Sequence, residues 1–311
     1  AIEKMGAFCS QQEAELHHFS QLPPPPPPLR DTSSESFYSE DTEDRLSQIP
    51  PPPPRETFDE PIYNFREAEL EAVKRNGDNL KNTSPAFRND YEIVMLAVKQ
   101  NGLNLQYASN ELKNNKDIVF IAITQNWNSI QYASIEMKNN YDIVLTVVKQ
   151  NGIALDYASD ELKNNEEIVF SAVKHNWEAL EYADNEMTNN EKILLEAVKQ
   201  NGIALWFASA NIRNNYEIVL EAVKQNGLVL QCSSDELKNN ESIVMSAVKQ
   251  NWEALESASD EMKQNFPIVL EAIKQNGLAL KYIKSEELKS NINIIKIALE
   301  NNGETIQYTS D

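Results

Sequence analysis

The sequence predicts an all-α fold: an α-solenoid of about ten 25-residue helix-pair repeats at residues 66–311, preceded by a disordered proline-rich tail at residues 1–65. Two observations predict it. The Asn of a recurrent Lys-Gln-Asn triplet returns about every 25 residues from Asn76 onward, which is the signature of a repeat array. Twelve of the 14 prolines lie before residue 62, so the helix-breaking residues are concentrated in the tail.

The charge balance restricts the partners. The 311 residues include 28 Lys and Arg against 48 Asp and Glu, a formal net charge of −20. This is a poor match for phosphate backbones and anionic lipids, so we expect protein partners and neither nucleic acid nor membrane insertion. No apolar stretch is long enough to cross a bilayer. We expect a soluble, cytoplasmic-type protein, and the sequence leaves its compartment open.

The tail combines proline runs with acidic residues. Two runs, at 23–28 and 50–54, flank a Ser-, Asp- and Glu-rich stretch at 31–44. Too few apolar side chains are present to offset the entropy of ordering. We therefore expect disorder with short polyproline II rods.

Each repeat is expected to hold two helices. In one unit Asn140 is a natural N-cap, and the apolar residues within 143–148 share one helical face. Gly152 follows, where a left-handed residue often ends a helix. The second helix is expected at 153–163, with a bend at Ser159.

One helix pair of this size cannot bury its own apolar face, whereas stacked pairs can. With helices packed ~8–10 Å apart, ten units give a rod of roughly 80–100 Å. The last residues, Tyr308–Asp311, stop in the middle of a repeat, and residue 1 is Ala. We expect from this that the chain is a fragment of a longer protein or lacks a closing cap.

Three recurrent sets of side chains have a structural and a binding interpretation. Trp replaces the repeat Gly at three places, where we expect inter-repeat packing and a capping role for the preceding Asn: Trp127, Trp177 and Trp252. Paired Asn residues, from Asn139-Asn140 to Asn239-Asn240, favour helix capping over a hydrogen-bonding strip. A tyrosine recurs once in several repeats and favours core packing over a ligand strip: Tyr107, Tyr132, Tyr157, Tyr182, Tyr282 and Tyr308.

Trp206 is a candidate interaction residue. The aligned residues in other repeats are polar, so the position is expected to be exposed, and an exposed Trp is a plausible binding hot spot. The alternative is that Trp206 shields the altered neighbourhood of Phe207 and Cys232.

No catalytic, cofactor or metal site is expected. The His residues are His17, His18 and His175, and no Ser/His/Asp, Cys/His or Gly-rich phosphate-binding arrangement is present. We therefore predict a protein that is not an enzyme and takes no cofactor. The sequence leaves open whether a catalytic domain lies outside this chain.

The repeat resembles a known family of tandem domains of unknown function, typified by ALxYASxELxNDxxVVLxAVxxNGxAL. The segments Asp160–Asn164, Ile168–Val169 and Ala172–Lys174 carry the resemblance well, and it covers about residues 66–311. It implies a helical repeat array. It implies no defined activity and no catalytic residues.

Both proline runs end in a basic residue at a spacing used for recognition. Pro25, Pro28 and Arg30 fit P-x-x-P-x-R, and so do Pro50, Pro53 and Arg55. The pattern resembles ligands of Src-homology-3 domains, because a pre-extended polyproline segment binds aromatic grooves at low entropic cost. Profilin is a competing reader of such runs, and a stiff passive spacer is the alternative.

A tyrosine follows each proline run in an acidic setting: Tyr38 and Tyr63. Glu60–Tyr63 resembles the EPIYA motif of bacterial effectors that host Src-family kinases phosphorylate, with Asn64 in place of the usual Ala. A phosphate on Tyr63 would lie just before the first helix, whose expected cap is Asn64 with Glu67 three residues on. A helix N-terminus favours this negative charge.

These features together predict a non-enzymatic scaffold whose tail recruits signalling or actin-regulating proteins. A secreted effector acting in a host cytoplasm fits the tail by resemblance. The alternative is a structural helical-repeat protein of a protist in which the tail is a passive linker.

Overall fold

The structure is a computed structural model that describes residues 61–308, with side chains from residue 65 onward. Within that range it is an all-α repeat fold of roughly 25-residue repeats without strands. Residues 1–60 lie outside it, and with them most of the predicted tail.

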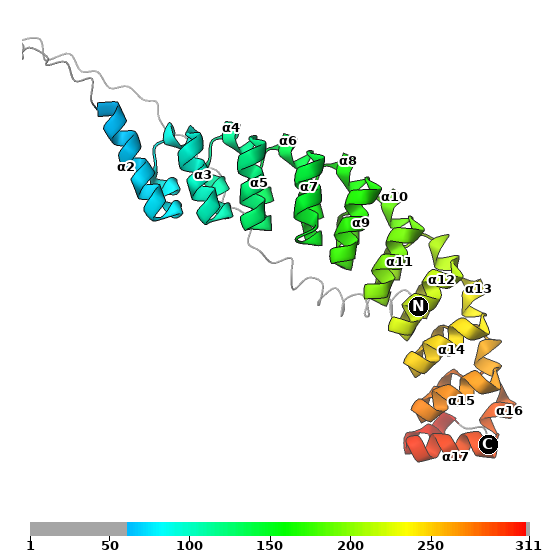
Figure 1. The fold of residues 1–311 in the computed structure, drawn as a ribbon. Helices are drawn as coiled ribbons and strands as arrows, with labels where there is room; N and C mark the ends of the chain where they lie inside the picture. Colours follow the sequence, from blue (N-terminus) through cyan, green and yellow to red (C-terminus); the bar gives the residue numbers. More distant parts are fainter. Residues whose placement is uncertain (1–60, 309–311) are drawn as a thin grey trace, which may run out of the picture. The chain divides into compact units, whose positions relative to one another are not determined.

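Each repeat of the described range contributes one long helix (Figure 1). The ten long helices are α2 (Pro61–Arg75), α3 (Tyr91–Gln100), α5 (Lys116–Gln125), α7 (Tyr141–Val148), α9 (Glu166–His175), α11 (Glu191–Gln200), α12 (Tyr216–Gln225), α14 (Glu241–Gln250), α15 (Phe266–Gln275) and α17 (Ile292–Asn301).

Helix α9 shows why these segments are helical. The side chain of Asn165 accepts a hydrogen bond from the backbone N–H of Ile168, which satisfies a free donor of the first turn. Four side chains on one face of the helix are buried: Ile168, Val169, Ala172 and Val173. The helix ends at His175 because Asn176 is extended, at φ −152° and ψ 118°. The predicted capping role of the paired Asn residues is confirmed.

The second half of each repeat differs from the single bent helix predicted at 153–163. A 3₁₀ helix, η6 (Gly152–Tyr157), is followed by extended Ala158 and Ser159 and then by a one-turn helix, α8 (Asp160–Lys163). The helix breaks because the backbone N–H of Ser159 donates to the carbonyl oxygen of Lys138 in the preceding repeat, at 3.1 Å. An inter-repeat bond therefore replaces an intrahelical one.

The same order recurs along the array. The 3₁₀ helices are η2 (Gly77–Asn82), η4 (Gly102–Tyr107), η5 (Trp127–Tyr132), η7 (Trp177–Tyr182), η8 (Gly202–Phe207), η10 (Gly227–Cys232), η11 (Trp252–Ser257), η13 (Gly277–Tyr282) and η14 (Gly303–Tyr308). The one-turn helices are α4 (Asn110–Lys113), α6 (Ile135–Lys138), α10 (Asn185–Thr188), α13 (Asp235–Lys238) and α16 (Glu286–Lys289). Short 3₁₀ turns replace them at η3 (Phe87–Asn89), η9 (Ile212–Asn214) and η12 (Met262–Gln264).

The prediction of a left-handed residue at Gly152 is wrong, because no described residue has a positive φ. The glycine is required by close approach instead. A Cβ atom at Gly152 would lie 2.3 Å from the carbonyl oxygen of Ala172 on the long helix of the next repeat. Glycine thus allows two backbones to meet at the seam between repeats.

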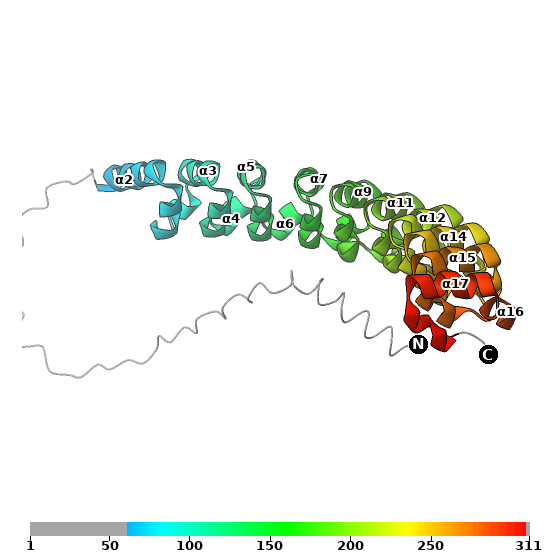
Figure 2. The ribbon, with the colours of Figure 1, turned by 90° about the horizontal axis from the view of Figure 1, so that it is seen from below.

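Neighbouring repeats pack in sequence order, each long helix against the next and each 3₁₀ helix against the next. The long helices form one layer, and the 3₁₀ and one-turn helices form the other (Figure 2). The core lies between the layers and is a single cluster from Leu70 to Ala298. Every repeat therefore presents a long-helix face and a short-helix face.

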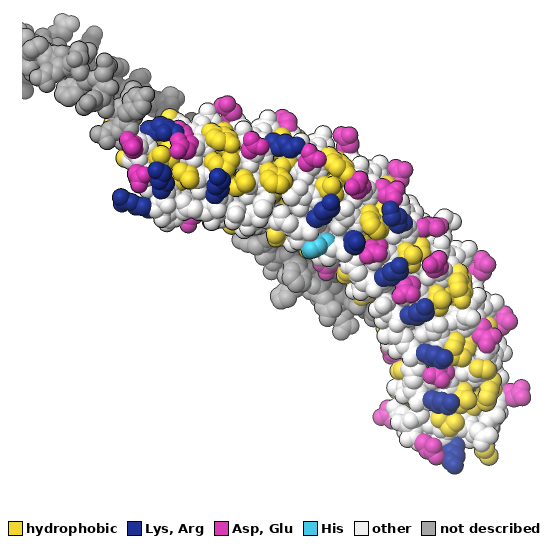
Figure 3. Space-filling view, viewed as in Figure 1, with side chains coloured by type: hydrophobic (Ala, Val, Ile, Leu, Met, Phe, Trp, Pro, Cys, Tyr) yellow, Lys and Arg dark blue, Asp and Glu magenta, His cyan; other side chains and the backbone are white. Residues whose placement is uncertain are grey.

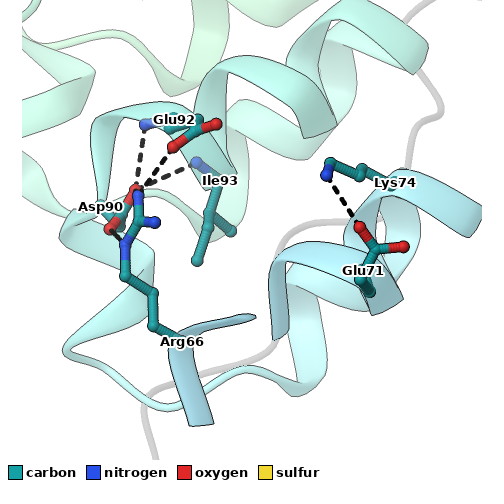
Figure 4. A network of polar contacts seen from close by, with 6 residues as sticks. All are labelled: Arg66, Glu71, Lys74, Asp90, Glu92 and Ile93. Carbon is teal, nitrogen blue, oxygen red and sulfur yellow. Dashed lines mark hydrogen bonds and ion pairs between the residues drawn. The ribbon is translucent and has the colours of Figure 1, made fainter. Parts of the chain in front are cut away.

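The first repeat corrects the expected start of the array. Helix α2 begins at Pro61, so Asn64 lies inside it and is not its N-cap, and the backbone of Tyr63 is helical. Arg66 on α2 ties this repeat to the next through hydrogen bonds to Asp90, at 2.7 and 3.1 Å, and to Glu92, at 2.9 Å (Figure 4). Asp90 is the N-cap of α3, so one carboxylate joins two repeats and starts a helix.

Candidate functional site

Most of the residues predicted to bind partners lie outside the described range. These are Pro25, Pro28, Arg30, Tyr38, Pro50, Pro53 and Arg55. Tyr63 lies in the first turn of α2, and its side chain is not described. Of the predicted partner-binding residues, only Trp206 has a described side chain.

Trp206 is half-buried on η8 and packs against the core. Its backbone carbonyl accepts a hydrogen bond from the guanidinium of Arg213 at 2.9 Å. The residues at the equivalent position of other repeats were expected to be exposed. Asp156 and Glu181 are exposed, but Gln106 is half-buried. Its surroundings therefore favour the packing interpretation of Trp206.

A ladder of hydrogen bonds runs along the edge of the array where the one-turn helices lie. The first Asn of most pairs bonds to the next repeat: Asn139 accepts from the hydroxyl of Ser159 at 2.5 Å and donates to Glu161 at 3.5 Å. Asn239 does the same with Ser259 and Glu261, at 2.5 and 3.0 Å. The paired Asn residues thus divide their roles, the first joining repeats and the second capping a long helix.

A second tie between repeats escaped the sequence reasoning. Gln200, the last residue of α11, donates to the carbonyl oxygen of Val173 at 2.7 Å and accepts from the backbone N–H of Trp177 at 3.0 Å. Further bonds from one long helix to the end of the preceding one are made by Gln100, Gln250, Gln275 and Asn301. The recurrence of Gln before the marker Asn was the available signal. We call this contact the glutamine clamp.

The Trp residues at the glycine place pack between repeats, as predicted. Trp177 contacts Phe207 edge-on with ring centroids 6.5 Å apart, and Trp252 lies 6.0 Å from the ring of Tyr282. The predicted cap is confirmed too, because Asn176 accepts from the backbone N–H of Glu178 at 3.0 Å. These rings fill space at the seams where no glycine brings the backbones together.

The recurrent tyrosines are half-buried against the core, in keeping with the packing interpretation. Burial raises the pKa of Tyr157 and of Tyr182 above the ordinary value. Burial also raises the pKa of Tyr282, and its hydroxyl donates to Glu256 at 2.9 Å, which raises the pKa further. These phenols therefore stay protonated, as a packing role requires.

The long-helix face carries most of the exposed apolar groups. Large apolar side chains on it are more than a third exposed: Phe65, Tyr91, Phe120, Tyr141, Tyr216, Phe266 and Ile292. Figure 3 shows apolar side chains along this face, with mostly acidic side chains on one edge and most of the Lys and Arg towards the other. The acidic edge lies at the helix N-termini and the basic edge at the C-termini, where each charge favours the helix dipole. This face, with its exposed apolar side chains between two charged edges, is the candidate interaction surface of the described residues.

Residues 61–308 contain neither a metal-binding cluster nor a bilayer-spanning helix. No group of three or more His, Cys, Asp or Glu residues there is arranged to hold a metal ion. No helix of that range is long and apolar enough to span a bilayer.

In the comparison with protein families, the chain matches a model described as "Domain of unknown function (DUF4116)". It matches seven segments: residues 66–113, 92–138, 115–163, 140–188, 165–213, 215–263 and 265–311. Each segment covers nearly two of the 25-residue repeats, so the first five matches, which start about one repeat apart, overlap, and the last three follow one another without overlap. Neither the search of curated proteins nor that of solved structures found a match. Because the matches extend over residues 66–311, well over half of the sequence, the chain belongs to the DUF4116 family.

Proposed function

We propose that the protein is a non-enzymatic interaction scaffold in which an α-solenoid of about ten repeats carries a disordered proline-rich recruiting tail. The observation that supports the array's part is repetition. Equivalent side chains return every 25 residues on one face, so the face offers the same chemistry many times along its length. Extended binding surfaces of this kind are what stacked helical repeats provide.

The tail's part rests on sequence motifs alone. Two P-x-x-P-x-R segments, ending at Arg30 and Arg55, would engage Src-homology-3 domains, with profilin as the competing reader. Phosphorylation of Tyr38 or Tyr63 would add roughly −1.5 to −2 charge each and create sites for Src-homology-2 domains. At Tyr63 the kinase would have to open the first turn of α2, and helix ends are where opening is least costly.

A pulldown with isolated Src-homology-3 domains tests the recruiting role. The double variant Arg30→Ala and Arg55→Ala should lose capture, while Arg66→Ala, which alters a basic residue of the array, should keep it. Capture that survives the double change would contradict the assignment. Capture of the double variant by profilin would support profilin as the reader of the proline runs.

Incubation of the full chain with a Src-family kinase, followed by mapping of phosphotyrosine, tests the second role. Modification at Tyr38 or Tyr63 is expected. If only tyrosines of the repeats are modified, or none, the phosphotyrosine role and the effector interpretation built on it are lost. The tail would then be a linker of a structural repeat protein.

A further inference from the structure

We propose that the long-helix face of α3, α5, α7 and α9 binds an acidic amphipathic helix of a partner protein. This inference concerns the array and goes beyond the recruiting role of the tail. The surface, here named the α3–α9 surface, consists of an apolar ridge and a lysine edge. The ridge is formed by Met95, Leu96, Phe120, Ile121, Leu145 and Phe170. The lysine edge is formed by Lys99, Lys149 and Lys174.

The ridge is accessible and continuous. Phe120 is 43% exposed and the other ridge side chains are half-buried, and they sit at equivalent positions of four consecutive helices. After the first turn, none of these four helices contains an Asp or Glu. Helices α11, α12 and α15 differ, because Glu196, Glu221 and Glu271 interrupt the same row. Contiguous exposed apolar surface of this kind marks an interaction site.

The unpaired charge of this surface is positive, although the whole chain is strongly acidic. Lys99, Lys149 and Lys174 are exposed, and no ion pair of the described residues includes them. On the opposite, acidic edge Lys116 pairs with Asp142 at 2.6 Å, whereas Asp117 and Glu167 are exposed and no ion pair of the described residues includes them.

Carboxylates at both ends of this edge are paired within the array. Arg66 holds Asp90 and Glu92, and Lys192 pairs with Glu166 at 3.2 Å. A partner gains most by bringing carboxylates to the lysine edge, since opposite charges across an interface steer and orient binding.

The spacing of the ridge fits a helical partner. Side chains seven residues apart on an α-helix lie ~10.5 Å apart along its axis. Packed neighbouring helices lie ~8–10 Å apart, so one partner residue every two turns meets one ridge residue per repeat. Lys192 bounds the surface at its far end, because its ammonium lies 4.5 Å from the centroid of the Phe170 ring. A helix of about four to five turns would cover the ridge.

Two synthetic peptides test the proposal with the full chain. Both are 18-residue amphipathic helices with the same Leu stripe, one with Glu and the other with Lys at the remaining positions. Binding is followed by fluorescence anisotropy of the labelled peptide. The acidic peptide should bind, and Phe120→Ser should weaken it at least ~tenfold, the scale of a truncated anchor residue.

A charge pair provides the matched control. Lys149→Glu with Lys174→Glu should weaken the acidic peptide at least ~tenfold through reversed charge pairing. Lys224→Glu with Lys274→Glu makes the same net change on α12 and α15, outside the surface, and should leave binding within ~twofold. Circular dichroism verifies that each variant keeps its helix content.

Several results would overturn the proposal. Equal losses in the two charge variants would show long-range attraction and no defined site. No binding of the acidic peptide, or binding of the basic peptide that Phe120→Ser weakens equally, would exclude an acidic partner. Self-association of the chain that Phe120→Ser abolishes would assign the surface to a second copy.

Discussion

At the scale of single residues, the packing of one repeat on the next depends on the size of the side chain at the position of Gly152 and its equivalents. A Cβ atom at Gly152 would come within 2.3 Å of the Ala172 carbonyl oxygen, whereas one at Gly303 would meet nothing within 4 Å. Trp127, Trp177 and Trp252 occupy this place elsewhere, so the seams they enter are built around a side chain. Each seam is therefore matched to its own residue.

We expect Gly152→Ala to lower the free energy of unfolding by ~1–3 kcal/mol, the cost of overpacking, because the backbones have to move apart. Gly303→Ala should leave it unchanged within error. Urea unfolding followed by circular dichroism measures both. A Gly152→Ala variant with an unchanged free energy of unfolding would mean that the two backbones are not closely packed at this position.

The one histidine of the described range occupies a glutamine clamp position. His175 aligns with Gln200, and its clamp partners would be the Val148 carbonyl oxygen and the Gly152 N–H. We expect His175→Gln to raise the free energy of unfolding by ~0.5–1.5 kcal/mol through a new hydrogen-bonded contact. Gln200→Ala should lower it, and thermal unfolding compares the two. A stabilised Gln200→Ala variant would contradict the clamp.

At the scale of elements, features set by local sequence could be predicted, whereas features set by contacts between repeats could not. The long helices could be predicted because their signals are local. The side chain of Asn165 accepts a hydrogen bond from an N–H three residues on, and the buried residues of α9 recur with helical spacing within that one helix. The break at Ser159 could not be predicted, because its cause is the Lys138 carbonyl oxygen of the preceding repeat. The clamp of Gln200 was missed for the same reason, since an exposed Gln gives no local signal. The exposure of Trp206 could not be predicted from the polar residues at equivalent places in other repeats, because Gln106 is half-buried whereas Asp156 is exposed.

The cap of α3 offers a pH-dependent test at this scale. Burial alone would raise the pKa of Asp90, but the hydrogen bond and charge of Arg66 and the backbone N–H groups of α3 lower it below the ordinary value. The unfolded chain therefore takes up this proton at a higher pH than the folded chain. The contribution of Asp90 is present above the ordinary Asp pKa and is lost as the pH falls through the lowered pKa.

We expect Asp90→Ala to cost about 1 kcal/mol at neutral pH, the value of an N-cap. Asp90→Asn keeps a capping oxygen, as Asn does in the other repeats, and should cost less than ~1 kcal/mol for the partly exposed ion pair. The difference between the original chain and Asp90→Asn should shrink at acid pH. Unfolding curves at several pH values measure it, and a difference that grows on acidification would refute the ion-pair argument.

At the scale of the array, the clamps are not evenly distributed. The clamp bonds of the described range tie α2 to α3, α9 to α11, α12 to α14, α14 to α15 and α15 to α17. Three consecutive seams, from α3 to α9, have Gln125, Gln150 and His175 at the clamp position without such a bond. Because repeat arrays open locally, the weakest interfaces should open first.

We therefore expect amides of residues 116–175 to exchange hydrogen faster than those of residues 191–275. Hydrogen exchange with mass spectrometry of the full chain measures both in one sample. Uniform protection along the array would show that the clamps add little to the apolar packing. Faster exchange in residues 191–275 would contradict the idea.

The ladder between repeats has one more consequence. The backbone N–H of Ser134, Ser159 and Ser259 each reaches a lysine carbonyl oxygen 21 residues earlier: Lys113, Lys138 and Lys238. Removing or duplicating a stretch of one full period, such as 151–175, would leave every donor facing an equivalent acceptor. Copy number can therefore change by unequal recombination without a misfit of these backbone bonds at the new junction, and we expect paralogues of different length.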